Sequence, residues 1–213
     1  MTTYDFQRCS VLLVEDNEYI AKIFKNILKS FKFGDITSVA NGEEAISFLK
    51  NSKSSLSGGC GVDLIISDLV MTPINGLLLL RWVRASKDCP NRMIPFMMIS
   101  GAADEEYVNS ARDLGVTEFL AKPFSVQSIY KHLLQLVDRP RQFVTGTTYY
   151  GPDRRRKVAT NFKEKDRRVQ LEENITVVYS AGKVFKPDKN SNVWYWKLPN
   201  TLQAKVAGGA VGT

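Results

Sequence analysis

Four short apolar runs, each followed at once by polar side chains, constrain the fold of this chain more than any other feature. Residues 11–14 precede Glu15 and Asp16, residues 64–67 precede Asp68, residues 96–99 precede Ser100, and residues 118–121 precede Lys122. Short apolar runs that alternate with helical patterns are typical of buried parallel strands. Because open parallel sheets place their sites beyond the carboxyl ends of the strands, we expect these five side chains at one edge.

The segments between the runs have helical spacing and residues that favour helix ends. Asn17 and Ser125 are placed to cap the first and last helices, and Gly34 would end the first one. Asn41 with Glu44 resembles a capping pair. With a further strand over residues 36–39, the chain contains five strand–helix units. They predict an α/β fold with a five-stranded, doubly wound parallel sheet and right-handed crossovers.

The bulk composition of the 213 residues is that of a globular protein, with 44% hydrophobic and 24% charged residues. No apolar stretch approaches the roughly 20 residues that span a bilayer, and the N-terminus lacks a signal-peptide layout. We therefore expect a cytoplasmic protein without a membrane span. Cys9, Cys60 and Cys89 have no metal-ligand spacing, so reduced structural thiols are expected.

The charge divides the chain into two parts. Residues 1–138 hold 14 basic against 16 acidic side chains (net −2), and residues 139–213 hold 15 against 6 (net +9). Residues 139–173 have few aliphatic side chains and predict a basic linker or docking arm. Residues 174–213 predict a hairpin extension, partly β or irregular, in which 175–179 would pair with 193–198 before a frayed end.

The acidic residues at the predicted sheet edge point to a metal. Glu15, Asp16 and Asp68 would be unstable together as bare anions, because like charges raise each other's proton affinity. A few hard oxygen ligands suit Mg²⁺, which keeps several waters and binds through one or two carboxylates plus a phosphate. We therefore expect Mg²⁺ at this edge.

Asp68 is the best candidate nucleophile, since it directly follows an apolar run and precedes a loop. Carboxylates attack phosphoryl groups to give aspartyl phosphates. Lys122 would supply a point charge to one phosphoryl oxygen and Ser100 a hydroxyl donor to another. The Lys122–Pro123 bond is a candidate cis peptide.

In this order and at these strand ends, the residues resemble the receiver domain of bacterial two-component response regulators, over residues 8–138. The resemblance implies a flavodoxin-like receiver fold, with Asp68 as phosphoacceptor and Glu15 and Asp16 as the acidic pair that holds Mg²⁺. It also implies that Val70 lends its backbone carbonyl to the metal. Ser100 and Phe119 would be the switch residues, and Lys122 with Pro123 the Lys-Pro pair.

Three features depart from the family pattern or bear on its kinetics. Pro73 lies one position later than usual after the acceptor, and residues 52–61 look like an insertion. Val70 and Ala102, each two residues beyond a site residue, are apolar and cannot hold a hydrolytic water. We therefore expect slow self-dephosphorylation.

Each residue also has an ordinary structural interpretation when taken alone. Glu15 and Asp16 could cap a helix, Lys122 could be a solvated charge, and Phe119 could be a core residue. His132, the sole histidine, is more typical of a surface or packing residue than of a phosphorelay residue. Their joint occurrence at strand ends favours the phosphoryl site.

The implied function is that of a two-component response regulator, a phosphorylation-controlled switch. Asp68 would take a phosphoryl group from a histidine kinase or phosphotransfer protein. The face formed by the fourth helix, fifth strand and fifth helix, residues 104–138, would then signal to a downstream protein or support homodimerisation. The chain would catalyse only its own phosphorylation and dephosphorylation. We therefore do not expect it to be an enzyme that acts on a separate substrate.

Two alternatives come from other classes. A transcriptional or nucleic-acid-binding regulator would use the basic extension, whose partner-binding candidates are Arg154, Arg155, Arg156 and Lys157. It is not favoured, because no helix-turn-helix pattern is present. A phosphohydrolase with an aspartyl nucleophile would need a second acid two residues later, where this chain has Val70.

Overall fold

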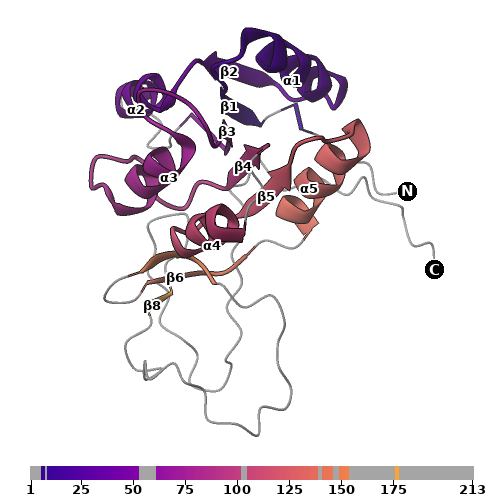
Figure 1. The fold of residues 1–213 in the computed structure, drawn as a ribbon. Coiled ribbons are helices and arrows are strands. Elements are labelled where there is room, and N and C mark those ends of the chain that lie inside the picture. The colour runs from indigo at the N-terminus through magenta and orange to yellow at the C-terminus, as the bar shows by residue number, and fades with distance from the viewer. Residues whose placement is uncertain are drawn as a thin grey trace, which may run out of the picture.

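The structure, a computed structural model, describes residues 6–7, 9–52, 61–101, 105–138, 141–145, 149–153 and 176–177. Its centre is a parallel sheet of five strands in the order β2-β1-β3-β4-β5 (Figure 1). The strands are β1 (Ser10–Val14), β2 (Asp35–Val39), β3 (Leu64–Asp68), β4 (Phe96–Ser100) and β5 (Glu118–Ala121). This is the predicted doubly wound α/β fold.

Five helices cover the two faces of this sheet. They are α1 (Glu18–Ser30), α2 (Gly42–Asn51), α3 (Gly76–Ala85), α4 (Glu105–Asp113) and α5 (Val126–Asp138). Helices α1 and α5 cover one face, and α2, α3 and α4 cover the other (Figure 1). Adjacent parallel strands need a long crossover connection, which here is a helix in each case. Helices on both sides of the sheet bury both of its apolar faces.

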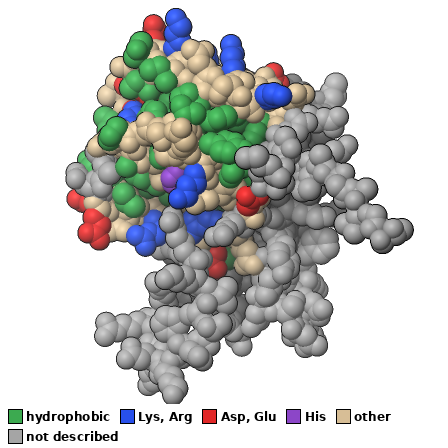
Figure 2. All heavy atoms as spheres, turned by 90° about the vertical axis from the view of Figure 1, so that its right-hand side faces the viewer, with side chains coloured by type: hydrophobic (Ala, Val, Ile, Leu, Met, Phe, Trp, Pro, Cys, Tyr) green, Lys and Arg blue, Asp and Glu red, His purple; other side chains and the backbone are tan. Residues whose placement is uncertain are grey.

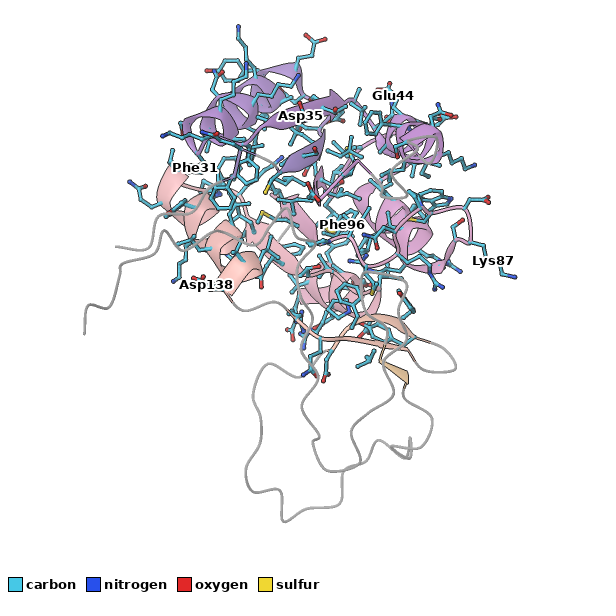
Figure 3. The ribbon with its side chains drawn as sticks, turned by 180° about the vertical axis from the view of Figure 1, so that it is seen from behind. Phe31, Asp35, Glu44, Lys87, Phe96 and Asp138 are labelled. Atoms are coloured by element: carbon cyan, nitrogen blue, oxygen red, sulfur yellow. The ribbon has the colours of Figure 1, made fainter. Side chains whose placement is uncertain are left out.

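The two faces hold separate hydrophobic clusters because side chains alternate along each strand. In β1, Val11 and Leu13 join the cluster under α1 and α5, whereas Leu12 and Val14 join the cluster under α2, α3 and α4. Phe96 is fully buried in the second cluster. In Figure 3, Phe96 lies inside the molecule, while side chains such as Lys87 project from its surface.

The face over α1 and α5 leaves apolar side chains within reach of solvent. Phe31 and Tyr130 pack with ring centroids 5.1 Å apart, and Ile27 and Leu134 are likewise only partly buried. Figure 2 shows this side of the molecule, where hydrophobic side chains lie among basic and acidic ones. The two helices thus share one mixed apolar and charged surface.

The predicted helix caps are present. The Asn17 side chain accepts hydrogen bonds from Tyr19 N and Ile20 N. Asn41 accepts from Glu43 N and Glu44 N, while the Glu44 carboxylate accepts from Ala40 N at 2.9 Å. Ser125 and Ser128 cap each other's backbone amides at the start of α5. These bonds satisfy amides that the first helical turn leaves unpaired.

The end of the first helix differs from the prediction. Helix α1 ends at Ser30, and Lys32 rather than Gly34 takes the left-handed backbone conformation, with φ 64°. Gly34 has a different role, since a Cβ there would lie 2.0 Å from the Gln7 carbonyl oxygen. The glycine is therefore needed for close packing of the N-terminal segment.

Part of the extension folds onto the main sheet's helices. Strands β6 (Phe143–Thr145), β7 (Tyr150–Pro152) and β8 (Thr176–Val177) form a small antiparallel sheet in the order β7-β6-β8. The hairpin falls where the sequence suggested a linker or docking arm, and β8 pairs with β6. Strand β8 lies within residues 175–179, which were expected from the sequence to pair with residues 193–198. The structure does not describe residues 193–198 or Arg154 to Lys157.

Other predictions concern single residues and the membrane. Cys9 and Cys89 are buried, and Cys60 lies outside the described residues. His132 Nδ1 lies 3.3 Å from Glu118 Oε2, so this histidine bridges α5 and β5. Within the part of the chain that the structure describes, no helix is long and apolar enough to span a membrane.

Candidate metal and phosphoryl site

The three predicted acids meet at one edge of the sheet. Val14 at the end of β1 is in register with Ser67 in β3, so Glu15 and Asp68 follow at neighbouring strand ends. Asp16 comes next in the chain and is exposed, whereas Glu15 and Asp68 are buried. Possible ligand oxygens of the three carboxylates all lie within 4.8 Å of one another. Parallel pairing brings together residues that are far apart in sequence.

Asp68 is held by contacts on both of its carboxylate oxygens. Oδ1 accepts a hydrogen bond from Leu69 N at 2.8 Å. Oδ2 lies 3.1 Å from Lys122 Nζ, which also lies 3.3 Å from Glu15 Oε2. The ammonium of Lys122 therefore bridges two carboxylates in a partly buried site.

Lys122 is fixed by the strand that precedes it. Its backbone amide donates to the Ser100 carbonyl oxygen at 2.7 Å, which joins the end of β5 to the end of β4. The Lys122–Pro123 peptide is cis, as the sequence suggested. The lysine thus reaches the acids from the neighbouring strand ends.

The charge balance at this edge fits a cation. Burial, and then the neighbouring Asp68 charge, raise the pKa of Glu15, while Lys122 and the Asn17 amide act in the opposite direction. The site holds three carboxylates, and the Lys122 ammonium bridges two of them. The donor set is hard oxygen, and exposed Asp16 leaves an open side for water, which suits a Mg²⁺ ion that keeps part of its hydration shell.

Comparison with known proteins decides the family. Residues 11–134, more than half of the chain, match the response regulator receiver domain family. The chain belongs to this family. The receiver is 26% identical over 129 residues to the chemotaxis protein CheY-3 of Vibrio cholerae. This match covers 61% of this chain and 92% of that protein.

Two further relatives support the assignment. The signal receiver domain of a histidine kinase from Syntrophus aciditrophicus has 31% identity and a TM-score of 0.51, and covers 61% of this chain and 90% of that one. The receiver is also 30% identical over 131 residues, 61% of this chain, to the 3′,5′-cyclic-nucleotide phosphodiesterase regA of Dictyostelium discoideum. That match spans only 15% of the phosphodiesterase.

The remaining candidate residues occupy different depths in the receiver. Ser100 is fully buried at the end of β4, and Phe119 in β5 is partly buried against the cluster under α2, α3 and α4. The Val70 side chain, two residues after Asp68, is 63% exposed. Pro123 follows Lys122 and is exposed.

Two supporting residues of the site were not predicted from the sequence. Ser67 Oγ donates to the Asp68 carbonyl oxygen at 2.8 Å. A Cβ at Gly76 would lie 2.3 Å from the same oxygen, so only glycine lets α3 begin this close to Asp68. The glycine was visible in the sequence, but its contact depends on how the loop returns to Asp68.

Proposed function

We propose that this receiver accepts a phosphoryl group on Asp68, in a Mg²⁺-dependent reaction, from a histidine kinase or a phosphotransfer protein. The arrangement that supports this proposal is the Asp68 carboxylate, 3.1 Å from the Lys122 ammonium and beside Glu15 and Asp16. Family membership supports the same reaction class.

In the proposed reaction an Asp68 oxygen attacks the phosphorus of a phosphohistidine. The new O–P bond forms as the N–P bond breaks, and the electron pair of that bond stays on the histidine nitrogen. Lys122 offsets negative charge on a phosphoryl oxygen, and Ser100 donates its hydroxyl to another. The protein contributes positioning and charge neutralisation.

The metal ligands would be Glu15, Asp16, Asp68 and the backbone carbonyl of Val70. A bound Mg²⁺ would offset the charge that carboxylates and phosphoryl oxygens bring together. Glu15 and Asp68 are the buried members of this set, and Asp16 is the member open to solvent. Loss of Asp16 should therefore weaken metal binding with little cost to the fold.

The signal would be a shift between two conformations of the receiver. Ser100 would move toward the acyl phosphate, and Phe119 would turn inward, which changes the face formed by α4, β5 and α5. A downstream protein, or a second copy of the chain, would bind the changed face. The receiver would catalyse only its own phosphorylation and dephosphorylation.

The test is phosphate incorporation in the full chain. The protein is mixed with acetyl phosphate and Mg²⁺, and intact mass is measured for the wild type, Asp68→Asn and Asp63→Asn. Asp63 is a matched control, since it is a buried acid at the opposite end of the β3 region, where it accepts from Ser10 N. We expect one added phosphoryl group in the wild type and Asp63→Asn only. Equal incorporation by Asp68→Asn would contradict the proposal.

A further inference from the structure

The loop of residues 69–75 joins β3 to α3 and contains Val70, whose backbone carbonyl is one of the proposed metal ligands. The loop is fixed at its start and closes on itself. Leu69 N donates to the Ile99 carbonyl oxygen at 2.9 Å, and Gly76 N donates to the Leu69 carbonyl oxygen at 2.9 Å. The chain therefore returns to Leu69 before α3 begins.

Asn75 holds the second end of this loop. Its side chain accepts from Leu78 N at 2.9 Å, and its carbonyl oxygen accepts from Leu79 N at 3.0 Å. The first of these bonds satisfies an amide that the first turn of α3 would otherwise leave unpaired. Asn75 therefore cannot move without loss of the helix cap.

The middle of the loop has two apolar anchors. Met71 is 4% exposed and Ile74 is partly buried, and both belong to the cluster under α2, α3 and α4. The side chains of Val70, Thr72 and Pro73 are exposed. Any displacement of the loop would therefore be taken up mainly by these three residues.

Helix α2 contacts the loop through Gly42, its first residue. Gly42 N donates to the Ile74 carbonyl oxygen at 3.1 Å. A Cβ at Gly42 would lie 2.6 Å from Ile74 Cγ2 and 2.7 Å from that carbonyl oxygen. Glycine is a poor helix former, so this contact, rather than helix propensity, explains its place at the start of α2.

A side chain at position 42 would displace the loop rather than the helix. Helix α2 is fixed by Ala45 and Leu49, which are both fully buried in the same cluster, and by its Asn41 cap. Close-packed side chains of this kind resist a shift. Because the ends of the loop are also fixed, the change would fall on residues 70–73, which include Val70.

We propose that Gly42 is a positioning residue of the metal and phosphoryl site, which acts through Ile74 on the β3–α3 loop. The inference rests on the proposed function, in which Val70 lends its carbonyl oxygen to the metal. Gly42 would not touch the ion. It would fix the path of the loop, and the loop would in turn fix the position of the Val70 carbonyl.

The first test measures Mg²⁺ binding to the full chain by calorimetry, without a phosphodonor. Gly42→Ala should bind Mg²⁺ about tenfold more weakly than the wild type, the lower end of the range for residues that orient metal ligands. Gly61→Ala adds the same methyl group where a Cβ meets no atom within 4 Å, and should bind like the wild type. An unchanged dissociation constant in Gly42→Ala would overturn the proposal.

The second test separates positioning from a general loss of packing. Ile74→Ala removes the Cγ2 atom that a Cβ at position 42 would meet. Gly42→Ala should therefore raise the dissociation constant for Mg²⁺ by a smaller factor in the Ile74→Ala background than in the wild type. Equal factors in the two backgrounds would contradict the role of Ile74.

Ile74→Ala alone also tests the proposal if Gly42→Ala fails to fold. This variant removes the anchor from the loop itself, so it should bind Mg²⁺ severalfold more weakly than the wild type. An Ile74→Ala variant that binds Mg²⁺ like the wild type would overturn the inference.

The third test follows phosphate incorporation from acetyl phosphate by intact mass, across a range of Mg²⁺ concentrations. In Gly42→Ala the Mg²⁺ concentration for half-maximal rate should rise with the dissociation constant, while the phosphate gained at saturating Mg²⁺ should equal that of the wild type. This shift in metal demand, with the final phosphorylation unchanged, is the expected signature of a positioning residue.

The outcomes distinguish the two proposals. A chain that gains phosphate, but whose Mg²⁺ affinity is the same in Gly42→Ala, would overturn the positioning role and leave the proposed function intact. A wild type that binds Mg²⁺ about tenfold more tightly than Gly42→Ala, yet gains no phosphate, would support the positioning role and remove the proposed function.

Discussion

Lys122 Nζ lies 3.3 Å from Glu15 Oε2, although 107 positions separate the two residues in sequence. The same nitrogen lies 3.1 Å from Asp68 Oδ2. A single ammonium therefore holds two buried carboxylates at the edge of the sheet, and most properties of the site follow from this three-residue contact.

Replacement of this ammonium should destabilise the receiver. In Lys122→Met, Glu15 and Asp68 keep their burial but lose their shared cation, which we expect to cost about 1 to 3 kcal/mol of unfolding free energy without Mg²⁺. Urea denaturation measures this cost. Lys131→Met, at an exposed position on α5, is the control and should change stability little. Equal stability of the two variants would mean that the bridge contributes nothing.

Glu15 should make the metal-free receiver less stable as pH rises. Its folded-state pKa is raised above 4.5, so the folded state binds the proton more tightly than the unfolded state does. Stability from this group is present below about pH 4.5 and is lost as pH rises through the folded value. Glu15→Gln should therefore melt higher than the wild type at pH 7 and similarly at pH 4. A wild type that melts higher at pH 7 would contradict this.

Addition of Mg²⁺ should raise the melting temperature, because the proposed ion would bind the folded site. At a concentration 100 times the dissociation constant, the gain is about 2.7 kcal/mol. Asp16→Asn should lose most of this gain, whereas Asp113→Asn, also exposed, should keep it. The measurement is thermal unfolding across a Mg²⁺ titration, with EDTA as reference. A full gain in Asp16→Asn would exclude this residue as a ligand.

The proposed acyl phosphate should be long-lived because Val70, two residues after Asp68 and 63% exposed, cannot orient an attacking water. Val70→Asn supplies a polar group at the same position and should shorten the lifetime several-fold. Loss of the added phosphoryl mass with time, after removal of the phosphodonor, gives the rate. Leu78→Asn, at an exposed position on α3, is the control. A wild-type half-life of seconds would refute the prediction.

Phe143 should be a major contributor to stability despite its place in the extension. Phe143→Ala removes a buried ring and uncovers Arg84, at an expected cost of about 3 kcal/mol or more. Val144→Ala, at the half-buried next position, should cost clearly less. Urea denaturation of both variants decides whether the hairpin is part of the folded unit.

The sequence predicted the sheet, its helices and the edge at which the acids meet. Periodic burial and local caps determine these features, as at Asn17 and at Asn41 with Glu44. The end of the first helix could not be read in the same way. Gly34 looked like a helix stop, but its lack of a side chain serves a contact with Gln7 that no local pattern contains.

The sequence by itself predicted the residues of the proposed phosphoryl site, because each one ends or directly follows a strand whose apolar run is visible in the chain. Only the tertiary structure decided that Lys122 bridges Glu15 and Asp68, and that Gly151 rests on Gly115. Such contacts depend on strand order and on the packing of segments far apart in the chain, which local periodicity does not encode.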